Sequence, residues 1–83
     1  MKVKVKLFAM LDRYLPPGSD RNEAEIELAN GATPAAVMEK LRLPTDMCHL
    51  VLVNGIYVAP DDRETRRLKE TDVVAIWPPI AGG

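Results

Sequence analysis

The chain has 83 residues, with 11 Lys and Arg against 12 Asp and Glu and a formal net charge of −1. This length provides one domain that buries only about 60 to 65% of its extended surface, so a deep private active site is not expected. The balanced charge argues against a nucleic-acid footprint and a polybasic membrane surface, which leaves proteins as the expected partners.

The chain contains one cysteine, Cys48, which excludes a disulfide framework within it. Its neighbour His49 is the only histidine, and two side chains supply too few ligands for a metal site. No stretch reaches the roughly 20 apolar residues of a membrane span. Residues 2–7 are interrupted by charge at every second position, unlike a signal peptide. A cytoplasmic location is therefore expected.

Two segments alternate between apolar and charged residues with period two, as half-buried strands do. Residues 2–7 carry lysines on their polar face and residues 23–28 carry glutamates, with a Pro-Pro-Gly-Ser-Asp loop signal at 16–20 between them. Opposite charges predict antiparallel pairing, each pair worth roughly a few tenths of a kcal/mol. A solvated sheet face is the simpler explanation and is compatible with pairing. The predicted pairs are Lys2–Glu27, Lys4–Glu25 and Lys6–Glu23.

A short helix is expected next. Asn30-Gly31 ends the first hairpin, Thr33 can cap the helix, and Pro34 can stand in its first turn, where a missing N–H costs nothing. Pro44 is expected to stop it. A helix of about ten residues is marginal on its own, so its apolar stripe must pack on the sheet. The stripe consists of Val37, Met38 and Leu41.

The second half of the chain begins with the pattern of a tight hairpin. A continuous apolar run at 50–53 leads to Asn54-Gly55, the pair favoured in type I′ turns, and then to residues 56–58. Residues 60–72 are a charged connection whose expected core anchor is Leu68. The basic cluster of this connection either docks an acidic partner surface or is simply solvated. It consists of Arg66, Arg67 and Lys69.

Residues 73–77 form the last expected strand. An α+β fold, with one main helix on one face of a mixed sheet of four to five strands, is the economical way to bury these faces. The first and last strands are expected to be parallel neighbours at its centre. Because residues 50–53 and 73–77 are apolar on both faces, apolar surface near the last strand should stay exposed for a partner. The alternative is that residues 60–68 fold over it.

The last six residues are Pro78, Pro79, Ile80, Ala81, Gly82 and Gly83. The two prolines favour an extended course away from the sheet. The six residues reach roughly 20 Å when extended, and the two glycines make the end thin enough for a narrow partner cleft. The group delivered there is the α-carboxylate of Gly83. The alternative is a frayed terminus without function.

Nearly the whole chain resembles, in order, the ubiquitin-like sulfur carriers of the MoaD/ThiS type. The most specific match is the end of the chain, Ile76-Trp77-Pro78-Pro79-Ile80-Ala81-Gly82-Gly83, which resembles that of the molybdopterin synthase small subunit. Three internal stretches are similar to the early segment, helix entry and hairpin of the family. They are Phe8-Ala9-Met10-Leu11, Gly31-Ala32-Thr33 and Val53-Asn54-Gly55.

The resemblance implies a ubiquitin-like β-grasp domain over residues 1–77 and an extended Gly-Gly tail over residues 78–83. It implies a role as the small subunit of molybdopterin synthase in molybdenum or tungsten cofactor biosynthesis, without catalysis by the chain alone and without a bound cofactor. The residues expected to contact partners are Trp77, Pro78, Pro79, Ile80, Ala81 and Gly82.

The resemblance also implies the chemistry of the tail. A ubiquitin-activating-type adenylyltransferase would adenylate Gly83 with ATP and magnesium, and a persulfide enzyme would supply the sulfur of a thiocarboxylate. That thiocarboxylate is a better nucleophile than the carboxylate. Within the large subunit of molybdopterin synthase, it would deliver sulfur to a pterin precursor.

Alternatives remain at this point. A carrier of the thiazole branch, a modifier joined to lysines through Gly83 and an interaction module with an inert tail share the same pattern, although Pro78-Pro79 and Ala81 favour the synthase subunit. A ferredoxin-type cluster is excluded because it needs about four cysteine ligands. Two segments depart from the family pattern, both away from the tail: residues 69–72 lack the usual glycine, and residues 12–22 form a longer connection.

Overall fold

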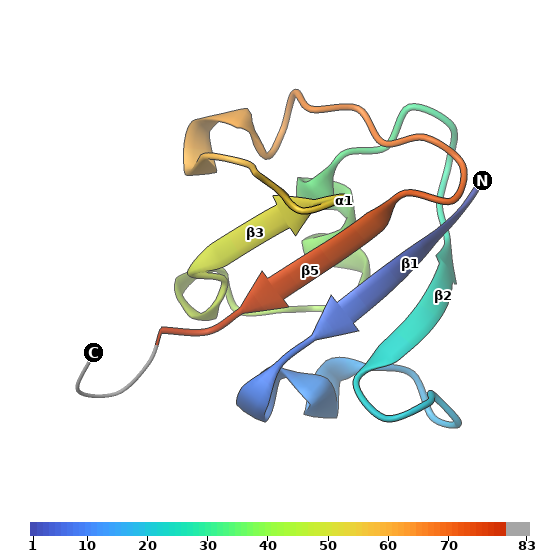
Figure 1. The fold of residues 1–83 in the computed structure, drawn as a ribbon, viewed down its shortest axis with the longest axis vertical. Coiled ribbons are helices and arrows are strands. Elements are labelled where there is room, and N and C mark those ends of the chain that lie inside the picture. Colours follow the sequence, from blue (N-terminus) through green and yellow to red (C-terminus); the bar gives the residue numbers. More distant parts are fainter. Residues whose placement is uncertain (80–83) are drawn as a thin grey trace.

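The computed structural model describes residues 1–79, which form a five-stranded sheet with one α-helix against it (Figure 1). The strand order is β2-β1-β5-β3-β4. β1 and β5 are parallel at the centre and the other neighbours are antiparallel, which confirms the predicted mixed sheet. The elements are β1 (Lys2–Leu7), β2 (Glu23–Glu27), α1 (Pro34–Lys40), β3 (Leu50–Val53), β4 (Ile56–Tyr57) and β5 (Val73–Trp77).

The register between β1 and β2 is the one that their charges predict. Lys2 lies opposite Glu27, Lys4 opposite Glu25 and Lys6 opposite Glu23. Within residues 1–79, however, only Lys6 and Glu23 approach as an ion pair, at 3.9 Å. The charged residues therefore mark the solvated side of β1 and β2. The apolar residues on the other side contribute most of the free energy that stabilises the pairing of these strands.

Helix α1 begins as expected and ends earlier. Thr33 occupies the cap position with extended backbone, but its side chain makes no capping hydrogen bond. The helix has seven residues instead of about ten. Arg42 adopts a left-handed φ of 58°, and the N–H of Leu43 donates to the carbonyl of Met38 at 2.9 Å. This left-handed turn closes the helix before Pro44 is reached, so the expected proline stop was wrong.

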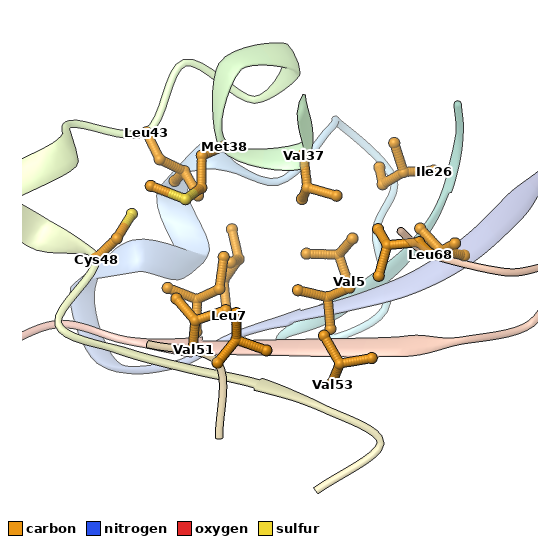
Figure 2. Packing of buried hydrophobic residues seen from close by; sticks show 14 of the residues in the cluster. Val5, Leu7, Ile26, Val37, Met38, Leu43, Cys48, Val51, Val53 and Leu68 are labelled. Carbon is orange, nitrogen blue, oxygen red and sulfur yellow. The ribbon is translucent and has the colours of Figure 1, made fainter. Parts of the chain in front are cut away.

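The core lies between α1 and the central strands (Figure 2). Val5 and Leu7 of β1 and Val51 and Val53 of β3 are completely buried beneath Val37 of the helix. Leu68 is 3% exposed, which confirms it as the anchor of the charged connection. Because α1 is too short to be stable alone, this packing is what holds it helical.

The β3–β4 turn is held to the start of β5 by side-chain hydrogen bonds. Asn54 and Gly55 have φ values of 52° and 82°, as the predicted two-residue turn requires. The amide group of Asn54 donates to Asp72 Oδ1 at 2.9 Å and accepts from the N–H of Val73 at 2.9 Å. The N–H of Lys69 donates to Asp72 Oδ2 at 2.8 Å. Both carboxylate oxygens of Asp72 are thus satisfied although the residue is buried.

The protonation of Asp72 links this network to pH. Burial by itself raises the pKa of Asp72, but the hydrogen bonds from Asn54 and Lys69, with the charges of Arg66 and Lys69, outweigh it and hold the pKa below 3.8. A carboxyl group with a lowered pKa in the folded state contributes stability above its unfolded value. That contribution is lost as pH falls through the folded pKa.

We expect Asp72→Asn to lower the free energy of unfolding by about 1–3 kcal/mol at neutral pH, because a donor then faces the N–H of Lys69. The difference from the parent chain should shrink as pH falls below 3.8 and through the lower folded pKa, where the carboxylate of the folded protein becomes protonated. Urea unfolding at several pH values measures both quantities. The exposed Asp61→Asn is the control and should change little. An equal loss in the two variants, or a loss independent of pH, would contradict this account.

Candidate functional site

The C-terminal segment leaves from the centre of the sheet. β5 lies between β1 and β3, and its last residue, Trp77, ends beside both neighbours (Figure 1). The N–H of Phe8 donates to the carbonyl of Ile76 at 3.1 Å, and the N–H of His49 donates to the carbonyl of Trp77 at 2.9 Å. These hydrogen bonds therefore hold the chain through Ile76 on the β1 side and through Trp77, the residue before Pro78, on the β3 side. We call Trp77 and Pro78 the tail root.

Aromatic stacking adds to this attachment. The rings of Phe8 and Trp77 are parallel within 3°, with centroids 4.2 Å apart. Parallel β1 and β5 bring these residues side by side, since Leu7 pairs with Ile76 one position earlier. Aromatic pairs contribute about 0.5–1.5 kcal/mol beyond their buried area. No pattern in the sequence predicts the contact of Phe8 with the tail root, so this contact is a structural finding.

The predicted site residues fall into two groups. Trp77 is half-buried, Pro78 is buried and Pro79 is exposed, so the chain leaves the domain surface at Pro79. The other site residues, Ile80, Ala81, Gly82 and Gly83, lie outside the described residues. Their predicted roles stay predictions.

One face of the sheet carries α1 and the other is open (Figure 1). On this open face β1 and β2 present lysines and glutamates, whereas β5, β3 and β4 present apolar residues at paired positions. The apolar side chains are half-buried except for Tyr57, which is 55% exposed. We call this surface, which borders the tail root, the apolar half. Its residues are Leu50, Leu52, Tyr57, Val73, Ala75 and Trp77.

The charged connection does not fold over the apolar half. The N–H of Leu68 donates to the carbonyl of Ala32 at 2.8 Å, and the carbonyl of Arg63 accepts from the N–H of Ala35 at 2.9 Å. Both contacts place residues 60–68 against the segment around α1, on the opposite side of the sheet. The expected exposed apolar surface near the last strand is therefore confirmed.

The outer edge of β2 is partly closed to a further strand. The ammonium of Lys40 donates to the carbonyl of Glu27 at 2.6 Å, and Asp20 and Glu23 exchange backbone hydrogen bonds of 3.1 and 2.9 Å. The Lys40 side chain and the Asp20–Glu23 bridge thus occupy backbone polar groups of β2 that an edge strand would otherwise offer to another strand. The open face is the better candidate for partner contact because it offers apolar area next to the tail root.

Residues 1–79 contain no group of three or more His, Cys, Asp or Glu side chains that could hold a metal ion. No helix among them is long and apolar enough to cross a membrane.

Cys48 is 3% exposed and its thiol lies 3.5 Å from the carbonyl of Pro44. Burial raises the pKa of this thiol above 9.0, against an opposing effect of Arg63, and Asp46 raises it further. The thiolate is the reactive form, so this cysteine is a structural one. Cys48 lies in the hydrophobic core, as Figure 2 shows.

Comparison with known proteins is consistent with the geometry of the domain. The model of the ThiS family matches residues 5–83. The chain belongs to the ThiS family. No curated protein matches it significantly.

Solved structures agree with this assignment. A protein assigned as subunit 1 of molybdopterin converting factor, from Pyrococcus furiosus, is 30% identical with a TM-score of 0.70, and the match covers 95% of this chain and 98% of that one. SAMP1 from Haloferax volcanii is 23% identical with a TM-score of 0.69 and full coverage of both chains. Subunit 1 or 2 in a molybdopterin-converting-factor complex from Helicobacter pylori 26695 is 20% identical with a TM-score of 0.62 and full coverage of both.

These likenesses confirm the α+β β-grasp fold and the ubiquitin-like carrier family that the terminal motif indicated. The described geometry determines where the C-terminal segment leaves this ThiS-family domain. It holds the tail root at the centre of the sheet, next to the apolar half.

We expect Cys48 in the folded protein to react with a thiol reagent at neutral pH at least about tenfold more slowly than in the unfolded chain, because reaction requires local opening. Since its folded pKa is raised, the stability that the protonated thiol contributes is present below pH 9.0 and lost as pH rises through the folded value. Timed labelling followed by mass spectrometry measures the rates, with Cys48→Ala as the blank. Equal rates in folded and unfolded protein would contradict the structural role.

Proposed function

We propose that this ThiS-family chain is a sulfur carrier that acts as the small subunit of molybdopterin synthase in molybdenum or tungsten cofactor biosynthesis. The observation that carries the proposal is the tail root. Hydrogen bonds hold β5 through Ile76 on the β1 side and through Trp77 on the β3 side, and the sequence then continues through Pro78 and Pro79 to a terminal Gly82-Gly83. The likeness to the Pyrococcus furiosus protein supports this branch of the family.

The chemistry starts from an unreactive group. The carboxylate of Gly83 attacks the α-phosphorus of ATP, with magnesium bound by an adenylyltransferase, and pyrophosphate leaves. The terminal sulfur of a persulfide then attacks the acyl carbon, and AMP leaves. A second thiol attacks the resulting acyl disulfide, so the donor enzyme ends as a disulfide and Gly83 as a thiocarboxylate. This anion transfers its sulfur to a pterin precursor and the carboxylate is restored when water supplies the oxygen.

The contribution of this chain is placement. Four residues follow Pro79, which gives the terminal carbon a reach of roughly 14 Å beyond the domain surface. Gly82 and Gly83 have no side chains, so the same end fits more than one partner cleft. Because the root is fixed, less orientational freedom has to be lost when the end enters a cleft.

The apolar half provides a docking surface for these partners. It borders the tail root, so a partner bound there receives the tail directly. The expected partners are an adenylyltransferase of the ubiquitin-activating type, a persulfide enzyme and the large subunit of molybdopterin synthase. The Helicobacter pylori complex contains subunits 1 and 2 of molybdopterin-converting factor, and this proposal extends that kind of pairing to the present chain.

A second candidate is a carrier of the thiazole branch. The family model that matches residues 5–83 is that of ThiS, which favours this possibility. Activation of Gly83 is the same in both branches and only the acceptor of the sulfur differs. Conjugation of Gly83 to lysines is a third fate of the same activated terminus, and the experiment below separates it from the other two.

We expect intact mass spectrometry to show replacement of one oxygen by sulfur at Gly83 after incubation with ATP, a cognate activating enzyme and a persulfide donor. Extension of the chain by one alanine should abolish this change, because the terminal carboxylate then no longer lies where the activating enzyme would act on it. The free energy of unfolding should stay unchanged. Branched Gly-Gly adducts on other proteins would indicate a modifier instead. Full activity of the extended chain would contradict the carrier function.

We expect Leu52→Lys, at the centre of the apolar half, to raise the KM of the activating enzyme for this protein about tenfold, because a charge in a buried apolar contact weakens docking. Steady-state kinetics of pyrophosphate release measure the change. Glu25→Lys adds the same side chain to the same face, outside the apolar half, and is the matched control. Equal effects of the two substitutions would show that docking does not use the apolar half.

A further inference from the structure

Arg63 is the feature that the proposed function leaves unexplained. It follows the short 3-10 turn η3 (Pro60–Asp62) in the charged connection, where most of its charged neighbours are exposed. Its own side chain is buried, with only 7% of the residue exposed. Within residues 1–79, it is the one Lys or Arg in the buried class.

The hydrogen bonds of this guanidinium are few. Nη2 donates to the carbonyl of His49 at 3.3 Å. Nε is enclosed and has no acceptor among the described residues. Burying a charged donor without a partner destabilises a fold, and apolar replacements of buried ionic groups are often neutral or stabilising. Stability alone therefore does not account for an arginine at this position.

The enclosed Nε does not indicate a ligand site either. A hollow beside Arg63 is lined by α1 and the two flanking loops, and Glu39 and Glu64 are among its lining residues. These carboxylates disfavour an anion there, and Nε itself is not accessible from solvent. The partners of Arg63 within the chain thus offer the more direct explanation.

Those partners lead directly to the tail root. The carbonyl of His49 accepts from Arg63, and the N–H of His49 donates to the carbonyl of Trp77 at 2.9 Å. The backbone of Arg63 is anchored in turn, because its carbonyl accepts from the N–H of Ala35 in the first turn of α1 at 2.9 Å. Arg63 therefore connects the start of the helix to the residue that holds the end of β5.

We propose that Arg63 is a positioning residue for the tail. By holding the carbonyl of His49, it restrains the backbone of the residue whose N–H donates to the carbonyl of Trp77, from which Pro78 departs. This inference rests on the proposed function for its catalytic readout. Its structural readout is independent, because Trp77 is the only tryptophan of the chain and its fluorescence reports on the tail root.

The test compares Arg63→Met, Arg63→Lys and the exposed control Arg67→Met. Three quantities are measured: urea unfolding, Trp77 emission and the kinetics of thiocarboxylate formation with ATP, an activating enzyme and a persulfide donor. Arg63→Met should be at least as stable as the parent chain. Its Trp77 emission should shift, and kcat should fall at least about threefold with KM unchanged, since small misplacements of a reacting group reduce rates strongly and the apolar half is untouched.

Arg63→Lys retains one donor that can reach the His49 carbonyl and should recover part of the emission and of kcat. Arg67→Met should match the parent chain in all three measurements. Parent-like emission and kcat in Arg63→Met would overturn the inference, as would its failure to fold, since Arg63 would then be a stability residue. If the parent chain itself forms no thiocarboxylate, the proposed function fails, whereas an emission shift would still support the positioning role.

Discussion

The parallel pairing of β1 with β5 is the constraint on which the rest of this structure depends. It places the last strand at the centre of the sheet, with a hydrogen-bonding neighbour on each side. Phe8 reaches Trp77 only because of this pairing, and the two rings stack at 4.2 Å. A segment that left from an edge strand would be held on one side. Here the backbone is held as far as the carbonyl of Trp77, the residue before Pro78.

The single helix determines where partners can bind. α1 covers one face of the sheet, and the charged connection packs on the helix side through Leu68 and Arg63. The other face keeps a charged part over β1 and β2 and the apolar half over β5, β3 and β4. Under the proposed carrier function, the open face and the C-terminal tail are what the chain presents to larger enzymes.

Two buried charged residues show different uses of polar groups. Asp72 has hydrogen bonds to both carboxylate oxygens and a lowered pKa, so its network stabilises the fold and fixes the β3–β4 turn against β5. Arg63 makes one long side-chain hydrogen bond and keeps an enclosed N–H without an acceptor. The contribution of its hydrogen bonds to stability is enough to explain why Asp72 is present. The hydrogen bonds of Arg63 give no such explanation, and its connection to the tail root through His49 is the reason to assign it a positioning role.

The sequence by itself determined the strands, the register of β1 with β2, the Asn54-Gly55 turn and the terminal motif, because these follow from period-two alternation and local backbone preferences. It also predicted an exposed apolar surface, since one helix covers one face. Only the tertiary structure decided the early end of α1, the stacking of Phe8 on Trp77 and the burial of Arg63. These features depend on contacts between segments distant in the chain, and no local pattern distinguishes Arg63 from the solvated Arg67 nearby.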